Sequence, residues 1–319
     1  RRRHPGRHFG GAGRRGLTGA EGPTIIAPIV KPSLGLRPHE TAAMVGELIQ
    51  AGVDFIKDDE KLMSPAYSPL AERVKAIVPL ILDHEQKTGK KVMYAFGISH
   101  ADPDEMMRNH DLVLEAGGNC AVININSIGF GGMAYLRKRS GLVLHAHRNG
   151  WDILTRHPGL GMDFRVWQQF WRLLGVDQFQ INGIGSKYWE PDDSFVRSFR
   201  ALREPLFAAD DRPMPVVCSG QWAGQPPPPF PRLPTPTFPA LCAGGGVADV
   251  RLRGHGGGAG GGGLLDRGPC RGLLGGGPED DCGRLRGAGS RGGPRCPRAH
   301  RGGPGFFRLG WTGPEPPIG

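Results

Sequence analysis

The stretch Gly52–Glu60, GVDFIKDDE, decides the fold because it joins a short apolar strand to a run of charges. Its apolar residues predict a strand at Asp54–Lys57, so that Lys57, Asp59 and Glu60 stand at or just beyond the carboxyl end. Barrels of parallel strands build their active sites at that end. Because side chains alternate along a strand, we expect Lys57 and Asp59 to point to the same side, and Glu60 to turn inward on the following loop.

Similar short strands recur on both sides of this stretch and alternate with segments of helical period. This alternation predicts parallel strands joined by crossover helices. An eighth strand is expected near Phe238–Cys242. The first seven are predicted at Ile25–Val30, Asp54–Lys57, Val92–Phe96, Ala121–Asn126, Leu142–His147, Gln178–Asn182 and Met214–Cys218. We therefore predict an α/β fold, a (β/α)8 TIM barrel that is incomplete at its C-terminal end.

Four intervals between these strands carry clear helix signals. Pro38–Gln50 has an apolar stripe and ends before Gly52, which is typical of a helix C-terminus. Ser68 and Pro69 are expected to be the N-cap and first residue of a second helix. The pair Asp102 and Pro103 predicts a third helix over Met106–Leu114, and the fourth is expected at Asp163–Leu174.

The basic charge of the chain lies at its two ends. The formal net charge is +10, but residues 1–21 hold six arginines and one acid, and residues 250–319 hold eleven arginines and five acids. Residues 22–249 are therefore close to neutral, which argues against a nucleic-acid-binding surface on the central part. We expect an Arg/Gly-rich segment at 1–21, a catalytic barrel at 22–225, and a Pro/Gly/Arg-rich low-complexity tail at 226–319.

The tail has two interpretations. Arginine, glycine and proline without lysine are typical of GC-rich DNA translated in a wrong frame, and also of an Arg/Gly-rich RNA-binding tail. Little aromatic interleaving precedes Phe306, so RNA binding is the minor alternative and no nucleic-acid partner is expected. No apolar run reaches the roughly 20 residues needed to span a bilayer. We therefore expect no membrane partner and a cytoplasmic location.

Lys57, Asp59 and Glu60 are candidate metal ligands. Two carboxylates with a third oxygen donor suit a hard cation such as Mg²⁺. A bare ammonium cannot be that third ligand, but Lys57 carbamylated by CO2 would supply an anionic oxygen. The alternative interpretation of KDDEK is a solvated run of charges after a strand.

KDDE at the end of the second strand resembles the metal-binding motif of the RuBisCO large-subunit family. Five further segments resemble the same family in the same order along the chain. They are IVKPSLGL with Lys31, the HAHR segment His145–Arg148, Gly161–Val166, the strand Asp177–Gly183 followed by Lys187, and Met214–Gly220 with its Ser-Gly turn. A buried, hydrogen-bonded histidine remains an alternative for the HxH pair.

The resemblance implies a role for each matching residue. Mg²⁺ would be held by Lys57, as its CO2-derived carbamate, with Asp59 and Glu60. Lys31, Lys57 and Lys187 would be catalytic. The substrate and its phosphate would be bound by His147, Arg148, Ser219, Gly220, Gly244 and Gly245. The family acts on phosphorylated sugars and forms homodimers, so both partners are expected for this chain.

Departures from the family pattern identify the branch. Ser33 stands where carboxylating members have a second lysine, Gln180 replaces a histidine, and Ile29 replaces a threonine. Together with INGIGSKYWEP and SGQWAGQ, they resemble the non-photosynthetic RuBisCO-like proteins, some of which decarboxylate or transcarboxylate oxidised branched-sugar phosphates. We expect a Mg²⁺-dependent enolising lyase or isomerase that does not fix CO2; true ribulose-bisphosphate carboxylase activity is the alternative.

A second alternative is a catalytically incomplete fragment or pseudoenzyme. The resemblance begins at Phe9, and the family's N-terminal domain, which contributes catalytic residues to a partner subunit, has no counterpart in this sequence. Intact Lys57, Asp59 and Glu60 argue against a fully decayed enzyme.

Overall fold

The computed structural model describes residues 25–157, 159–184, 189–207, 211–221 and 240–243, and the statements below concern these residues. Their strands form one parallel sheet in the order β1-β8-β7-β6-β5-β4-β3-β2. The strands are β1 (Ile25–Ile26), β2 (Phe55–Lys57), β3 (Met93–Gly97), β4 (Cys120–Asn124), β5 (Val143–His147), β6 (Gln178–Ile181), β7 (Met214–Gln221) and β8 (Ala240–Ala243). The prediction of an α/β fold with parallel strands is confirmed.

The segment after β1 also pairs with β2, the strand at the opposite end of this order. Ile29 forms an isolated parallel bridge with Lys57. The Val30 N–H donates to the Lys57 carbonyl at 3.0 Å, and the Lys57 N–H donates to the Pro28 carbonyl at 3.2 Å. The predicted strand Ile25–Val30 is thus wrong as one continuous element, because Pro28 has no N–H to donate to a ladder.

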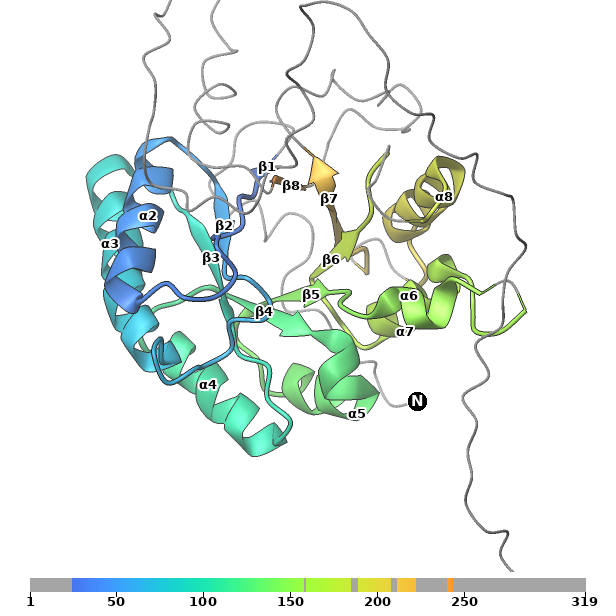
Figure 1. Ribbon diagram of the computed structural model, residues 1–319, viewed down its shortest axis with the longest axis horizontal. Coiled ribbons are helices and arrows are strands. Elements are labelled where there is room, and N and C mark those ends of the chain that lie inside the picture. The colour runs from blue at the N-terminus through green and yellow to red at the C-terminus, as the bar shows by residue number, and fades with distance from the viewer. Residues whose placement is uncertain (1–24, 158, 185–188, 208–210, 222–239, 244–319) are drawn as a thin grey trace, which may run out of the picture. The chain divides into compact units, whose positions relative to one another are not determined.

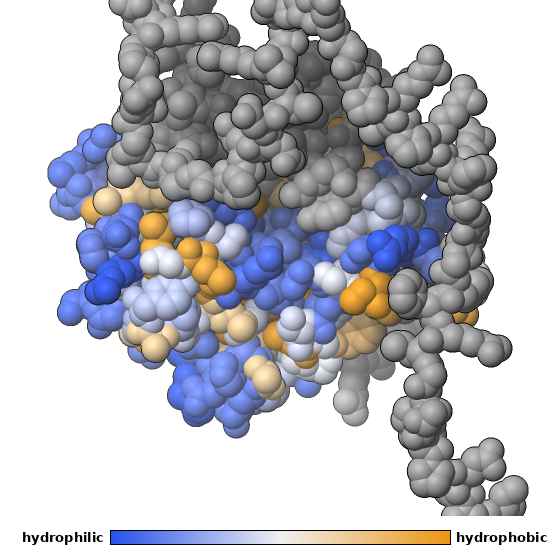
Figure 2. Space-filling model, in the orientation of Figure 1, coloured by the Kyte–Doolittle hydropathy of each residue, from blue (hydrophilic) through white to orange (hydrophobic). Residues whose placement is uncertain are grey.

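Helices lie around the outside of the strands (Figure 1). They are α2 (Pro38–Gln50), α3 (Leu70–Thr88), α4 (Pro103–Glu115), α5 (Ile125–Arg137), α6 (Trp151–Thr155), α7 (Phe164–Leu173) and α8 (Asp192–Arg203). On the face in Figure 2 the surface over α2, α3 and α4 is mainly hydrophilic, as expected for amphipathic helices that bury only one stripe.

Of the predicted N-caps, Asp102 is confirmed and Ser68 is wrong. The Asp102 side chain accepts from the Asp104 N–H at 2.8 Å and so caps α4. The Asp163 side chain accepts from Arg165 and caps α7. Helix α3 begins at Leu70, whose N–H donates to Ser64 Oγ at 3.0 Å, so Ser64 rather than Ser68 satisfies this helix end.

Most other differences between the predicted and the observed structure lie at the ends of strands. The expected strand Ala121–Asn126 ends at Asn124, because the backbone turns into α5 at Ile125. The predicted Gln178–Asn182 ends one residue earlier, and β7 continues to Gln221. Helix α5 was missed because its glycines hide the helical period, and Gly129 has a φ of 67° at a kink.

The core has two parts, divided by the strands. One buried cluster lies between the strands and the helices and includes Ile56, Tyr94 and Phe96. The other is formed by the alternate strand residues, among them Phe55 and Met93. Cys120 and Cys218 belong to this second cluster as buried thiols. None of the described helices is long and apolar enough to cross a membrane.

Candidate active site

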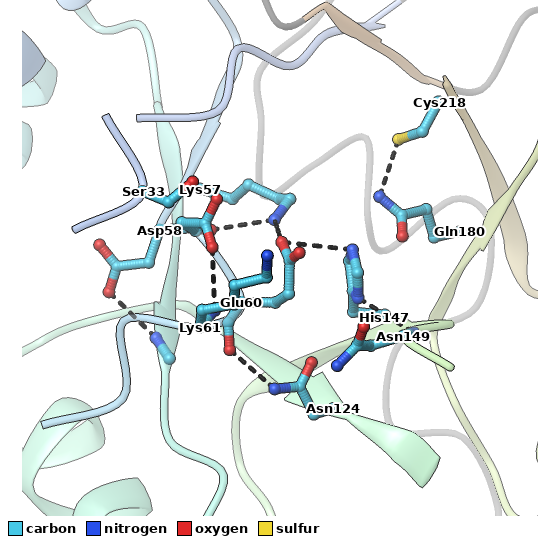
Figure 3. Close-up of polar contacts among 12 residues, drawn as sticks. Ser33, Lys57, Asp58, Glu60, Lys61, Asn124, His147, Asn149, Gln180 and Cys218 are labelled. Carbon is cyan, nitrogen blue, oxygen red and sulfur yellow. Dashed lines mark hydrogen bonds and ion pairs between the residues drawn. The ribbon is translucent and has the colours of Figure 1, made fainter. Parts of the chain in front are cut away.

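Lys57 is the buried centre of the site. It is the last residue of β2 and its side chain is 0% exposed. Its Nζ donates to the Asp58 carbonyl at 2.9 Å and lies 3.4 Å from Glu60 Oε2 (Figure 3). The expected inward turn of Glu60 is confirmed, because its carboxylate faces Lys57 rather than solvent.

Asp58 points away from Lys57 and has a structural role. Its Oδ1 accepts from the Tyr94 hydroxyl at 2.6 Å, and its Oδ2 accepts from the Gly97 N–H at 3.1 Å. It also pairs with the fully buried guanidinium of Arg73. Burial, followed by the negative charge of Asp58, raises the pKa of Tyr94 well above its usual value. Asp58 therefore lies on the helix side of β2, apart from Asp59 and Glu60.

Asp59 faces the first predicted catalytic lysine. The Lys31 ammonium forms an ion pair with Asp59 Oδ2 and donates to Ser33 Oγ at 2.9 Å. Burial acts to raise the pKa of Asp59, but hydrogen bonds from Lys31, the Lys61 backbone and Ser33 outweigh it and lower the pKa. The Lys31 side chain is 45% exposed, so this pair lies at the open side of the site.

His147 brings β5 to the same cluster. Its Nε2 lies 3.3 Å from Glu60 Oε2, and its Nδ1 accepts from the Asn149 N–H at 3.2 Å. Burial, and then the positive charges of Lys57 and Arg148, hold the pKa of His147 well below 6.5. The neutral ring must therefore carry its proton on Nε2 and donate to Glu60. We call Lys31, Lys57, Asp59, Glu60 and His147 the lysine–carboxylate cluster.

His145, two residues earlier, fits the alternative interpretation of a buried histidine. Its Nδ1 lies 2.9 Å from Gln178 Oε1, and its ring packs against Phe55. Burial lowers the pKa of His145 to about 3, with the charge of Lys57 as the next cause. Of the HxH pair, His145 is thus a core residue and His147 is a site residue.

Asn124 is a site neighbour that sequence reasoning missed. It ends β4 and is in register with His147 on β5. Its Nδ2 donates to the Glu60 carbonyl at 2.7 Å, and its backbone N–H donates to Ser99 Oγ at 2.8 Å. The available signal was an asparagine near the carboxyl end of a predicted strand, but it lay inside the overlong prediction Ala121–Asn126.

Arg148 belongs to a second polar group, which we call the arginine network. Its guanidinium donates from NH1 to Gln180 Oε1 at 2.7 Å and from Nε to Asn182 Oδ1 at 3.0 Å. The Asn182 amide in turn donates to the buried carboxylate of Glu190. Burial raises the pKa of Glu190 despite hydrogen bonds from Asn182 and Ser194. The network comprises Arg148, Gln180, Asn182 and Glu190.

The other predicted site residues lie in segments that are not described or whose side chains are not described. Lys187, Gly244 and Gly245 lie outside the described residues. Ser219 and Gly220 lie on the backbone of β7. Within the described part of the chain, no three His, Cys, Asp or Glu side chains converge as metal ligands.

Comparison with known sequences identifies the family. The catalytic domain of the ribulose bisphosphate carboxylase large chain matches residues 12–264. The chain belongs to this family. The predicted resemblance to RuBisCO is confirmed over most of the chain, including both polar groups described above.

Similar curated proteins are RuBisCO-like enzymes. A 3-oxo-isoapionate-4-phosphate decarboxylase of Rhizobium rhizogenes is 75% identical over 244 residues, which cover 76% of this chain and 58% of that protein. A 3-oxo-isoapionate-4-phosphate transcarboxylase/hydrolase of Xanthobacter autotrophicus is 48% identical over 68% of this chain and 52% of that protein. The chain thus spans a little over half the length of these relatives.

Solved structures agree with this assignment. A RuBisCO-like protein from Burkholderia fungorum matches with a TM-score of 0.70 and 41% identity, over 74% of this chain and 58% of that one. The octameric ribulose-1,5-bisphosphate carboxylase/oxygenase of Pyrococcus horikoshii matches with a TM-score of 0.72 and 25% identity, over 78% of this chain and 60% of that one.

Proposed function

We propose that this chain carries the catalytic part of a decarboxylase acting on a phosphorylated 3-oxo sugar acid, with 3-oxo-isoapionate 4-phosphate as the first substrate to test. The observation that carries the proposal is the intact lysine–carboxylate cluster in a chain 75% identical to an enzyme with that name. The exchanges at Ser33 and Gln180 support decarboxylation over CO2 fixation.

The substrate class fits the chemistry that the cluster can perform. Loss of CO2 from a 3-oxo acid breaks the C1–C2 bond and leaves its electron pair in an enolate of the C3 ketone. The enolate then takes up a proton at C2. Cationic groups near the ketone oxygen stabilise the charge that develops there, and Lys31 supplies one such group at the open side of the site.

Lys31 and His147 of the cluster, and Arg148 of the arginine network, have separate roles in this reaction. Lys31, at the open side and hydrogen-bonded to Asp59 and Ser33, holds the proton that is delivered to C2. His147 is neutral, so it donates a hydrogen bond from Nε2 without adding charge. Arg148 binds the phosphate, for which a planar guanidinium is well suited, and Gln180 with Asn182 fixes its orientation.

The donor set also fits Mg²⁺. A buried lysine that faces one carboxylate at 3.4 Å and a backbone carbonyl is weakly compensated as an ammonium. Conversion of the Lys57 amine to a carbamate would replace it by anionic oxygens beside Asp59 and Glu60, a ligand set of the kind Mg²⁺ prefers. When bound there, Mg²⁺ would act as a Lewis acid on the substrate carbonyl.

We also propose that the sheet is a closed (β/α)8 barrel and that the protein self-associates. Pairing of β1 with β8, and of Ile29 with Lys57 on β2, supports closure. The octameric Pyrococcus horikoshii relative supports self-association. Sedimentation velocity of the purified chain tests the second point, and a monomer at all concentrations would contradict it.

The reaction itself is tested with the full chain and 3-oxo-isoapionate 4-phosphate labelled with ¹³C in the carboxyl group. In buffer with Mg²⁺ and bicarbonate, a decarboxylase releases the label as CO2, whereas a transcarboxylase keeps it in an organic product. Ribulose 1,5-bisphosphate serves as the substrate control for CO2 fixation. A folded protein that consumes neither compound would contradict the proposal and favour the incomplete-fragment alternative.

A further inference from the structure

Asn124 presents an acceptor atom whose orientation is fixed. Its Nδ2 donates to the Glu60 carbonyl at 2.7 Å. Exchange of the amide nitrogen and oxygen would set Oδ1 against that carbonyl oxygen. The hydrogen bond therefore fixes which terminal atom of the amide is the nitrogen and which is the oxygen. Oδ1 therefore points away from the Glu60 carbonyl, on the side where Glu60 and His147 meet (Figure 3).

This oxygen has no hydrogen-bond partner among the residues that the structure describes. The Asn124 side chain is buried, with the residue 5% exposed, and Oδ1 itself is shielded from solvent. A buried acceptor without a partner loses its hydration, which destabilises the folded chain by about 1–3 kcal/mol. The side-chain nitrogen and the backbone N–H of Asn124 are satisfied by Glu60 and Ser99.

The surroundings of Oδ1 define what it can bind. It lies on the strand next to His147 and beside the carboxylate-bearing residue Glu60. A neutral amide oxygen accepts a hydrogen bond from a hydroxyl but has no attraction for a phosphate or a carboxylate. The chemical group that matches the position is therefore a hydroxyl on the carbon next to the substrate carbonyl.

We propose that Asn124 is a specificity residue whose Oδ1 accepts a hydrogen bond from a hydroxyl of the substrate, next to the reacting carbonyl. This inference deepens the proposed function, because it assumes that the lysine–carboxylate cluster binds a keto-sugar phosphate. It separates hydroxylated substrates from deoxy analogues of the same charge and length.

Two probes that differ by one hydroxyl test the inference without any turnover. Dihydroxyacetone phosphate and hydroxyacetone phosphate share a ketone and a phosphate, and only the first has a hydroxyl on the other carbon next to the ketone. Calorimetric titration of the full chain in Mg²⁺-containing buffer should give about five-fold tighter binding of dihydroxyacetone phosphate, as expected for one neutral hydrogen bond. Asn124→Leu should bind the two probes equally.

Two further variants separate recognition from structural support. Asn124→Ala should also lose the preference and replaces Asn124→Leu if that variant unfolds. Ser99→Ala removes the hydrogen bond to the Asn124 backbone but keeps the side-chain amide, and should retain the preference. A wild type that does not distinguish the probes, or an Asn124→Leu variant that still does, overturns the inference.

The two proposals fail separately. A chain that prefers dihydroxyacetone phosphate through Asn124 but does not release CO2 from the 3-oxo acid contradicts only the decarboxylase proposal. A chain that releases CO2 and shows no hydroxyl preference contradicts only the role of Asn124.

Discussion

The lysine–carboxylate cluster and the arginine network lie at neighbouring strand ends but are built differently. In the cluster, lysines and carboxylates from the segment after β1 and from the end of β2 face one another beside His147 of β5, and each lysine contacts a carboxylate. In the network, neutral amides from the end of β6 hold a single guanidinium. The cluster is suited to stabilise charge that develops during a reaction, whereas the network is suited to hold one guanidinium in a fixed orientation. We expect substitutions in the cluster to lower kcat and substitutions in the network to raise KM.

Replacement of Lys57 should give the largest effect. Lys57→Met removes the buried amine while preserving most of the volume, and should reduce decarboxylation by on the order of 10³-fold. The free energy of unfolding should change little, since an apolar side chain suits this buried position and Glu60 keeps its contact with His147. The steady-state rate and a chemical denaturation curve measure the two quantities. Lys61→Met, on the exposed neighbour, is the matched control; equal losses in both variants would contradict the assignment.

The pair Asp58→Asn and Asp59→Asn tests the division within KDDE. Asp58→Asn leaves the buried Arg73 without its charged partner and should lower the free energy of unfolding by about 3 kcal/mol. Asp59→Asn should cost less than about 1 kcal/mol, because its partner Lys31 is half-exposed, but should reduce the rate by about 10²-fold. Urea denaturation and initial rates distinguish them, and a reversed pattern would show that the two roles are exchanged.

Asn182→Ala tests the arginine network. Loss of the amide that holds Arg148 should raise the KM for the phosphorylated substrate about ten-fold, the size expected for a hydrogen bond to a charged group, with kcat within about two-fold. Ser194→Ala removes a contact to Glu190 but none to Arg148, and serves as the control. A fall in kcat at unchanged KM would place Arg148 in the chemical step instead.

The smallest effect concerns stability at acid pH. His145 has a folded-state pKa of about 3, well below the value of about 6.5 in an unfolded chain. Below pH 6.5 His145 therefore binds a proton in the unfolded state but not in the folded state. The free energy of unfolding falls as the pH drops from 6.5 toward 3. His145→Asn should reduce this dependence by roughly 1 kcal/mol for each pH unit. Denaturation curves at pH 7, 6 and 5 would measure it, and an unchanged slope would contradict the burial argument.

Much of the fold and the main part of the site could be predicted from the sequence. Alternating periods located every strand, because apolar periodicity and turn residues are local signals. The pointing directions of Lys57 and Glu60 followed from their place at a strand end. The ends of strands could be predicted less accurately. In the sequence, Asn124 and Ile125 fit a continuation of the strand. The helix that begins at Ile125 is favoured only when α5 packs on the sheet.

The contacts between distant segments were beyond sequence reasoning. Nothing local distinguishes Asp58, which pairs with Arg73 and Tyr94, from Asp59, which pairs with Lys31. The two histidines of HAHR carry the same side chain, and only their depth separates a core residue from a site residue. The arginine network joins the end of β5 to residues beyond β6, so its hydrogen bonds depend on the register of the sheet.

Arg73 has a consequence for how this protein can change over time. Besides Asp58, its guanidinium donates to the backbone carbonyls of Leu62, Met63 and Ser68, all in the loop that follows the lysine–carboxylate cluster. A carbonyl is present whatever side chain a residue bears. The backbone of this loop is therefore held chiefly by an arginine on the helix that follows it, and Ser64 is the loop side chain that also contributes a hydrogen bond. Substitutions at the exposed positions of the loop, for example in a laboratory library, should leave the geometry beside Glu60 unchanged.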